Sequence, residues 1–209
     1  MAGKITALKY QKKNRDRASV FIEGRFAFGV PVIVAAGLKR GQFLSDAEIE
    51  SLQEQGSIET GYGQTLNYLS YRPRSRAETV GYLEKRGQSE AQIEAIIGRL
   101  ERAGLLDDEA FAQYWVENRE RFRPRGTRAL RYELRTKGVA DALIDKALAS
   151  IDVSDSAHRA ASKKARQLAH LDQPTFRRKL VEYLARRGFD YGVAQETADH
   201  YWEALAMGD

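Results

Sequence analysis

The 209-residue chain contains no cysteine, four prolines and two methionines, and it has no long uninterrupted apolar segment. Without cysteine it can form neither a disulfide framework nor a thiolate metal site. Its longest apolar run, Gly29–Leu38, is much too short to span a bilayer and begins too deep in the chain to be a secretory signal. We therefore expect a cytoplasmic protein that does not enter a membrane.

No catalytic or cofactor-binding constellation is visible in the sequence. The stretch Gly56–Gly63 superficially resembles a phosphate-binding loop, but it lacks the lysine and the preceding apolar strand. Three histidines, His158, His170 and His200, are scattered without metal-ligand spacing. The acidic run Asp107–Glu109 is better explained as a helix cap with first-turn acids than as a metal site. We expect no enzyme, no metal and no cofactor.

Positive charge is concentrated in one segment. The whole chain has a net charge of +5, and Arg119–Arg135 alone holds seven arginines and two glutamates, a local net charge of +5. Such a segment suits a polyanion or an acidic protein surface. A solvated basic helix face is an equally good interpretation of the composition by itself.

The N-terminal segment differs from the rest of the chain. Its first 30 residues contain short, partly alternating runs rich in Ile, Val, Phe and Tyr, which predict a small antiparallel β unit with a tight turn at Gly24–Arg25. A short apolar helix at Val32–Ala36 and a helix opened by a capping box at Ser45–Glu48 should follow. The stretch Gln55–Gly63 interrupts this pattern, so we place a domain boundary there.

The remainder has helical spacing throughout. Ser89 is placed to cap a helix that ends at Gly104, and Asp107 or Asp108 to cap the next one. The buried side of that next helix should carry Phe111, Tyr114, Trp115 and Phe122. Aromatic residues here and near the C-terminus, including Tyr201 and Trp202, could stack on bases, but their helical spacing makes them core candidates first.

Three short motifs show that this helical part is repeated. Glycines at Gly87, Gly138 and Gly188 lie 51 and then 50 residues apart. Each has a leucine four positions before it, a basic residue one position before it and a proline fourteen positions before it. We therefore expect a tandem helical repeat with three helices in each unit. The predicted domains are 1–60 (β unit), 61–108, 109–153 and 154–209 (helical repeats).

Two of these prolines lie in a shared element, in Tyr71–Ser75 (YRPRS) and Phe122–Gly126 (FRPRG). Proline disfavours helix in the residue before it, so each element should be an elbow between two helices. The third repeat keeps Pro174 but lacks the flanking arginines. We therefore assign the proline to the repeat architecture and the arginines to function.

After the second elbow, Arg128, Arg131 and Arg135 share one helix face, while Leu130 and Leu134 point towards the core. Arginine suits bidentate pairing with phosphate or carboxylate. The candidate binding residues are Arg72, Arg74, Arg76, Arg121, Arg123, Arg125, Arg128, Arg131, Arg135, Arg177, Arg178, Arg186 and Arg187.

These segments resemble the bacterial RecX regulatory family. LLDDEAFAQYWVENR at Leu105–Arg119 and GTRALRYELRTKGV at Gly126–Val139 are similar to the family's most recognisable block. AETVGYLEKRG at Ala77–Gly87 and RRKLVEYLARRGFDY at Arg177–Tyr191 are similar to its other two repeats. The resemblance extends over Tyr62–Leu205, and the N-terminal β unit resembles the extension of longer members.

The resemblance implies a mainly α-helical protein whose three tandem three-helix repeats form an elongated, curved array after a small β-rich unit. It also implies a monomeric regulator, in DNA repair and the SOS response, that lies in the groove of a RecA–DNA filament and lowers filament growth, ATP hydrolysis and strand exchange. The family has no catalytic motif to carry over. A direct DNA-binding protein, contacting phosphates of single- or double-stranded DNA, is the alternative. A nucleic-acid or nucleotide enzyme ranks last.

Overall fold

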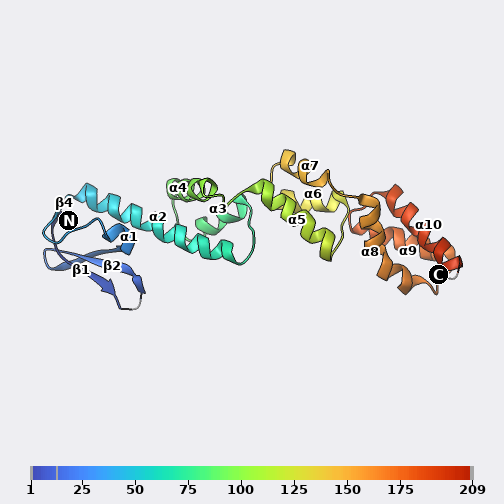
Figure 1. The fold of residues 1–209 in the computed structure, drawn as a ribbon, viewed down its shortest axis with the longest axis horizontal. Coiled ribbons are helices and arrows are strands. Elements are labelled where there is room, and N and C mark those ends of the chain that lie inside the picture. The colour runs from blue at the N-terminus through green and yellow to red at the C-terminus, as the bar shows by residue number, and fades with distance from the viewer. Residues whose placement is uncertain (1, 13, 208–209) are drawn as a thin grey trace. The chain divides into compact units, whose positions relative to one another are not determined.

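The computed structural model describes residues 2–12 and 14–207, and Figure 1 shows their ribbon. Helices dominate after an N-terminal sheet, as the sequence predicts. The chain divides into two compact units. The first holds the chain up to Arg72 together with Thr79–Leu106, and the second holds Pro73–Glu78 together with the chain from Asp107.

The predicted β unit is confirmed as an antiparallel sheet in the order β3-β2-β1-β4. Its strands are β1 (Gly3–Gln11), β2 (Asn14–Ile22), β3 (Arg25–Pro31) and the two-residue β4 (Phe43–Leu44), which was not foreseen. The turn between β2 and β3 is centred on Glu23 and Gly24, one residue earlier than predicted. Their φ angles are +46° and +78°, as a type I′ hairpin turn requires.

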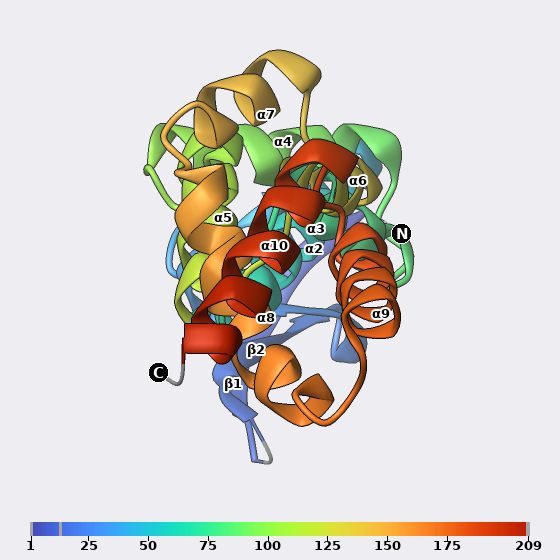
Figure 2. The same ribbon diagram turned by 90° about the vertical axis from the view of Figure 1, so that its right-hand side faces the viewer.

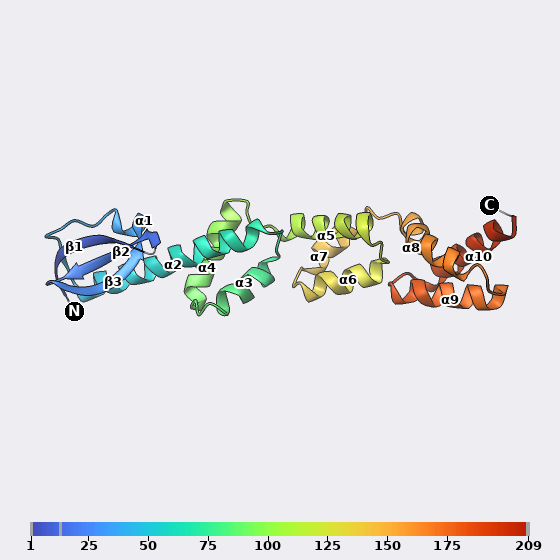
Figure 3. The ribbon, with the colours of Figure 1, turned by 90° about the horizontal axis from the view of Figure 1, so that it is seen from below.

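Two helices pack against this sheet, and both were predicted. Helix α1 (Val32–Ala35) follows β3 directly, and α2 (Asp46–Ser70) begins at a capping box formed by Ser45 and Glu48. Because buried residues alternate along β2 and β3, one face of the sheet packs on these helices in an apolar core. Figure 3 shows the three long strands in front of the start of α2.

The interruption of the helical pattern predicted at Gln55–Gly63 is wrong, because α2 runs through it as one helix, whereas the domain boundary placed there stays a prediction. Its buried glycines allow close packing instead. A methyl group on Gly56 would lie 2.8 Å from Val30 Cγ1, and one on Gly61 would lie 2.7 Å from Ile96 Cδ1. The same helix therefore packs on the sheet with one part and on the first repeat with another.

The first repeat combines the end of α2 with two further helices, α3 (Arg76–Glu84) and α4 (Glu90–Arg102). Ser89 caps α4 as predicted, and Gly104, with φ of +66°, follows its end. Its core consists of the fully buried Leu83, Ile96, Ile97 and Leu100 with their neighbours.

The second repeat contains α5 (Asp108–Phe122), α6 (Thr127–Thr136) and α7 (Asp141–Leu148). Asp107 caps α5 as predicted. The expected buried face of α5 is only partly right, because Tyr114 is 39% exposed and Phe122 is 69% exposed. Phe111 and Trp115 do face the core, which is completed on α5 by Ala112 and Val116.

The third repeat contains α8 (Val153–Leu168), α9 (Gln173–Arg186) and α10 (Tyr191–Met207), which pack around one core. Figure 2 shows α9 and α10 of this repeat alongside each other. The core of this repeat is rich in alanine along α8 and α10, so these helices approach closely. Trp202 and Tyr201 pack against it, in agreement with their assignment to the core.

Two hydrogen bonds within the second unit follow the same pattern. Ser75 Oγ donates to the carbonyl oxygen of Lys137 at 2.6 Å, and Gly126 N–H donates to that of Arg187 at 3.1 Å. Ser75 and Gly126 each precede the second helix of a repeat. Their partners, Lys137 and Arg187, each precede the glycine that follows the second helix of the next repeat. These glycines, Gly138 and Gly188, have φ of +75° and +88°.

The prediction of equivalent prolines is confirmed for two repeats and wrong for the third. Pro73 and Pro124 lie between helices, in the predicted elbows. Pro174 instead lies inside the first turn of α9, which begins earlier in its repeat and is capped by Asp172. Proline is compatible with that position because the first turn has no intrahelical partner for its missing N–H.

Candidate functional site

The arginine stripe on α6 is neutralised by carboxylates of the same repeat. Arg131 Nη1 lies 2.6 Å from Asp145 Oδ1, and Arg135 binds both oxygens of Asp141 at 2.7 and 3.0 Å. The hydrogen bonds from Arg135 hold the pKa of the Asp141 carboxyl below its ordinary value, and Asp141 raises the pKa of Arg135. Both side chains would have to leave these partners, or share them, to bind a phosphate.

The third arginine of the stripe has a different partner. Arg128 Nη2 donates to the carbonyl oxygen of Ala185 at 3.0 Å, at the end of α9. This carbonyl also accepts from the backbone N–H of Gly188 at 3.0 Å, so Arg128 adds a further donor at the end of the helix. Arg128 therefore fastens the second repeat to the third, while the rest of its side chain is exposed.

A second cluster of arginines converges on Glu133, whose side chain is 15% exposed. Arg119 Nε lies 2.8 Å from Glu133 Oε2, and Arg125 Nη1 lies 2.9 Å from Oε1. Trp115 Nε1 also donates to Oε2, at 2.7 Å. Sequence reasoning missed this centre because its members lie at non-helical separations across the elbow. Arg125 is consequently half-buried rather than projecting from an exposed corner.

The exposed part of the second elbow consists of Arg121, Phe122 and Arg123. Arg121 lies over the Phe122 ring at 5.1 Å from its centroid. Neither Arg121 nor Arg123 has a carboxylate partner in the part of the chain that the structure describes, 2–12 and 14–207. These two guanidinium groups are therefore available to an external anion.

The first elbow is less open. Arg72 and Arg74 are half-buried, and each takes part in interactions within the fold. Arg76 is exposed at the first turn of α3, and its backbone N–H donates to Asp108 Oδ1 at 2.7 Å. Ser75 and Glu78 form the predicted capping box. Lys137 approaches Glu78 at 2.6 Å and strengthens the joint.

The candidate arginines of the third repeat also separate into two groups. Arg177 pairs with Asp199 at 2.6 Å, and Arg178 pairs with Glu182 at 3.3 Å. Arg186 is exposed and, among the described residues, forms no ion pair. Arg187 lies over the Tyr183 ring, 5.2 Å from its centroid.

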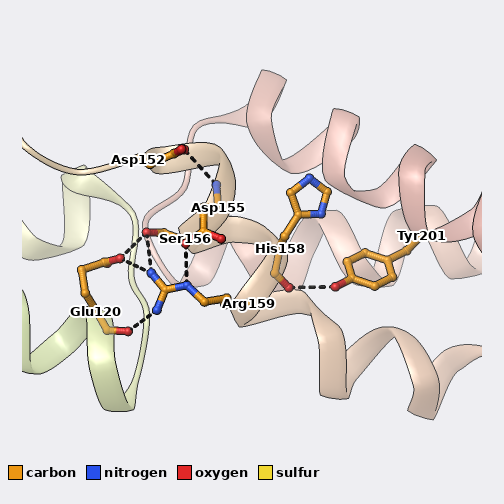
Figure 4. A network of polar contacts seen from close by, with 7 residues as sticks. All are labelled: Glu120, Asp152, Asp155, Ser156, His158, Arg159 and Tyr201. Atoms are coloured by element: carbon orange, nitrogen blue, oxygen red, sulfur yellow. Dashed lines mark hydrogen bonds and ion pairs between the residues drawn. The ribbon is translucent and has the colours of Figure 1, made fainter.

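A polar network links the end of α5 to the start of α8 (Figure 4). Arg159 binds Glu120 Oε2 at 2.5 Å and Asp155 Oδ2 at 2.7 Å, and the buried hydroxyl of Ser156 donates to the same Glu120 carboxylate. Burial alone would lower the pKa of Arg159, but the hydrogen bonds and charges of Asp155 and Glu120 raise it. The network stabilises the packing of the second repeat on the third.

Within the described residues, no group of three histidines, aspartates or glutamates is arranged to hold a metal ion. Asp107 Oδ1 accepts from the N–H groups of Glu109 and Ala110, so the acidic run is the helix cap that the sequence predicts. His158 and His200 are in ring contact with a centroid distance of 4.7 Å. No helix in the described part of the chain is long and apolar enough to cross a membrane.

The fold thus defines a tandem helical-repeat protein with an N-terminal sheet. Four models of regulatory protein RecX match it in order. These are the N-terminal domain at residues 3–45 and the first, second and third three-helix domains at 62–100, 107–148 and 152–197. The chain belongs to the RecX family, as its motifs indicated.

Individual relatives agree with this assignment and are named regulatory proteins. Regulatory protein RecX of Bacillus subtilis is 33% identical over 93% of this chain and 76% of its own length. That of Bacillus licheniformis is 32% identical over 90% of this chain and 74% of its own length. A crystal structure of regulatory protein RecX superposes with a TM-score of 0.76 at 26% identity, covering 95% of this chain and all of that one.

Proposed function

We propose that this protein binds the RecA–DNA filament and inhibits its growth, ATP hydrolysis and strand exchange. The observation that carries the proposal is the match of four successive segments to the domains of a regulatory family. The exposed Arg121 and Arg123 support it, because unpaired guanidinium groups suit the phosphates and carboxylates of a nucleoprotein surface.

The test uses RecA filaments formed with ATP on surface-immobilised single-stranded DNA. The filaments should retain the protein, and their ATPase rate should fall as protein is added. If the filaments neither retain the protein nor slow their ATP hydrolysis, the proposal is wrong.

Matched arginine variants locate the contact. Arg121→Ala with Arg123→Ala should weaken retention several-fold, since it removes two free cations. Arg131→Ala with Arg135→Ala removes the same charge, but these arginines already bind Asp145 and Asp141. This second variant should change retention less. An equal loss in both would mean that net charge alone sets the affinity, and no loss in either would place the contact elsewhere.

Direct DNA binding through phosphates is a second candidate, favoured by the exposed cations Arg121, Arg123 and Arg186. Affinity for naked DNA should then fall steeply with salt, by a logarithmic slope of about 0.9 per phosphate contact on a duplex and about 0.7 on a single strand. Binding that is undetectable or insensitive to salt would reject this candidate.

A further inference from the structure

The outer face of the N-terminal sheet carries aromatic rings. Alternate side chains of β2 from Ala18 to Ile22 enter the core, so Ser19 and Phe21 lie on the opposite face. Phe21 pairs with Phe26 of β3, and their ring centroids are 6.0 Å apart at an interplanar angle of 78°. The Phe26 side chain is 60% exposed. Large exposed rings on a sheet face are costly in water and usually mark a binding surface.

Lys9 lies beside these rings, in a segment that is rich in positive charge. Lys9 pairs with Ser19 on the neighbouring strand, and its Nζ lies 5.3 Å from the Phe21 ring centroid. The first 25 residues contain seven lysines and arginines against two acids, a net charge of +5. One of those acids, Glu23, is occupied, because its carboxylate accepts from the backbone N–H of Lys4 at 2.7 Å.

The basic surface continues towards the end of the β1–β2 hairpin. Lys12 and Arg15 line an open hollow of about 490 Å³ at that end, together with Tyr10, which pairs with the core-facing Ala18 and therefore lies on the other face of the sheet. Arg17 is the exception, since it is held by the Thr60 hydroxyl and the Gly29 carbonyl. The outer face therefore presents the rings of Phe21 and Phe26 near Lys9, with further cations towards the end of the hairpin.

We propose that the outer face of this sheet is a binding surface for single-stranded DNA, with bases stacking on Phe26 and Phe21 and phosphates contacting Lys9 and the cations of the hairpin. Stacking suits an unpaired strand because a duplex hides the faces of its bases. An acidic protein segment would pair with the lysines but would leave the rings uncovered. This site lies outside the helical repeats and does not require a recombinase.

The experiment measures the fluorescence anisotropy of a short labelled oligothymidylate with the full chain and no RecA. Phe26→Ala should weaken binding by about 5- to 150-fold, the range for loss of one stacked base. Phe26→Leu, which keeps an apolar side chain, should also weaken it, and Phe26→Trp should restore it. Ile33→Ala removes an apolar side chain of similar exposure, 67%, from α1 and should bind like the parent protein.

An abasic strand of the same length separates the contribution of base stacking from that of phosphate contacts, because it keeps the phosphates and lacks the bases. It should bind more weakly than oligothymidylate to the parent protein, and Phe26→Ala should reduce this difference between the two strands. Equal affinity of the parent for both strands, or parent-like binding by Phe26→Ala, would overturn the proposal. Failure to bind oligothymidylate would overturn it as well. The filament ATPase assay is independent, so filament inhibition that survives Phe26→Ala would leave the proposed function intact.

Discussion

Gly126 offers the sharpest test of the joint between repeats. A methyl group at this position would lie 2.1 Å from the carbonyl oxygen of Gly188 and 2.3 Å from the backbone nitrogen of Phe189. These are backbone atoms that cannot rotate away. The φ of Gly126 is −68°, which alanine adopts freely, so Gly126→Ala tests the contact and not the backbone conformation.

Three contributions set the expected size of the effect. Forcing a methyl group into a packed contact costs about 1–3 kcal/mol. Moving the backbone to relieve it weakens the hydrogen bond from Gly126 N–H to Arg187, worth about 1 kcal/mol. Alanine is also a poorer N-cap than glycine, by roughly 1 kcal/mol. Because neighbouring effects do not simply add, we expect a loss of at least about 2 kcal/mol in the free energy of unfolding of the second unit.

Tryptophan fluorescence is well suited to measuring this loss. The chain has two tryptophans, Trp115 in the second repeat and Trp202 in the third, and both belong to the second unit. With a urea slope of about 1–3 kcal/mol per molar, a loss of about 2 kcal/mol should lower the midpoint by about 0.7–2 M. Gly192→Ala is the control, because the added methyl group meets nothing within 4 Å. If both variants unfold at the parental midpoint, the joint does not hold the two repeats together.

Two further predictions concern carboxylates. Glu133→Gln should lower the free energy of unfolding by about 1–3 kcal/mol, because it removes the charge shared by two arginines. The measurement is urea unfolding followed by the fluorescence of Trp115. The control Glu182→Gln, in an exposed ion pair, should change the free energy of unfolding by less than about 0.5 kcal/mol. Hydrogen bonds from Ser45 lower the pKa of Glu48, so its stabilisation is present above the unfolded pKa and is lost as pH falls through the folded pKa. Hydrogen exchange in the first turn of α2 should therefore be faster in Glu48→Gln than in the parent at neutral pH, and equal below the folded pKa of Glu48. A difference that persists in acid would contradict this.

Local signals predicted most of the fold. The capping boxes at Ser45 and Ser89 and the glycine at Gly104 act within one turn of their helices, so neighbouring residues determine them. The glycines of α2 misled the prediction because a buried glycine permits close packing as readily as it ends a helix. Strand β4 has two residues, too few for any periodic pattern.

The candidate site was less predictable from the sequence. Whether an arginine is free to bind an external anion depends on carboxylates that are distant from it in sequence. Spacing correctly placed Arg131 and Arg135 on one helix face. It could not show that the adjacent α7 supplies Asp145 and Asp141 to that face. Likewise, nothing near Arg125 in sequence indicates that Glu133 will hold it.

Whether a basic helix face in a tandem repeat can bind a partner depends on the side chains that the neighbouring helices place against it. Helix α6 packs against α5 and α7 of its own repeat, and its Arg128 also reaches the end of α9 in the next repeat. On α6, the positions that face α7 and the end of α9 are the ones whose arginines are engaged. Arg121 and Arg123 lie in the last turn of α5 and just past it, and no carboxylate of the described residues pairs with them, whereas Arg125 of the same elbow is held by Glu133. Cations at the second elbow are therefore better placed to contact a partner than the more regular stripe that follows it.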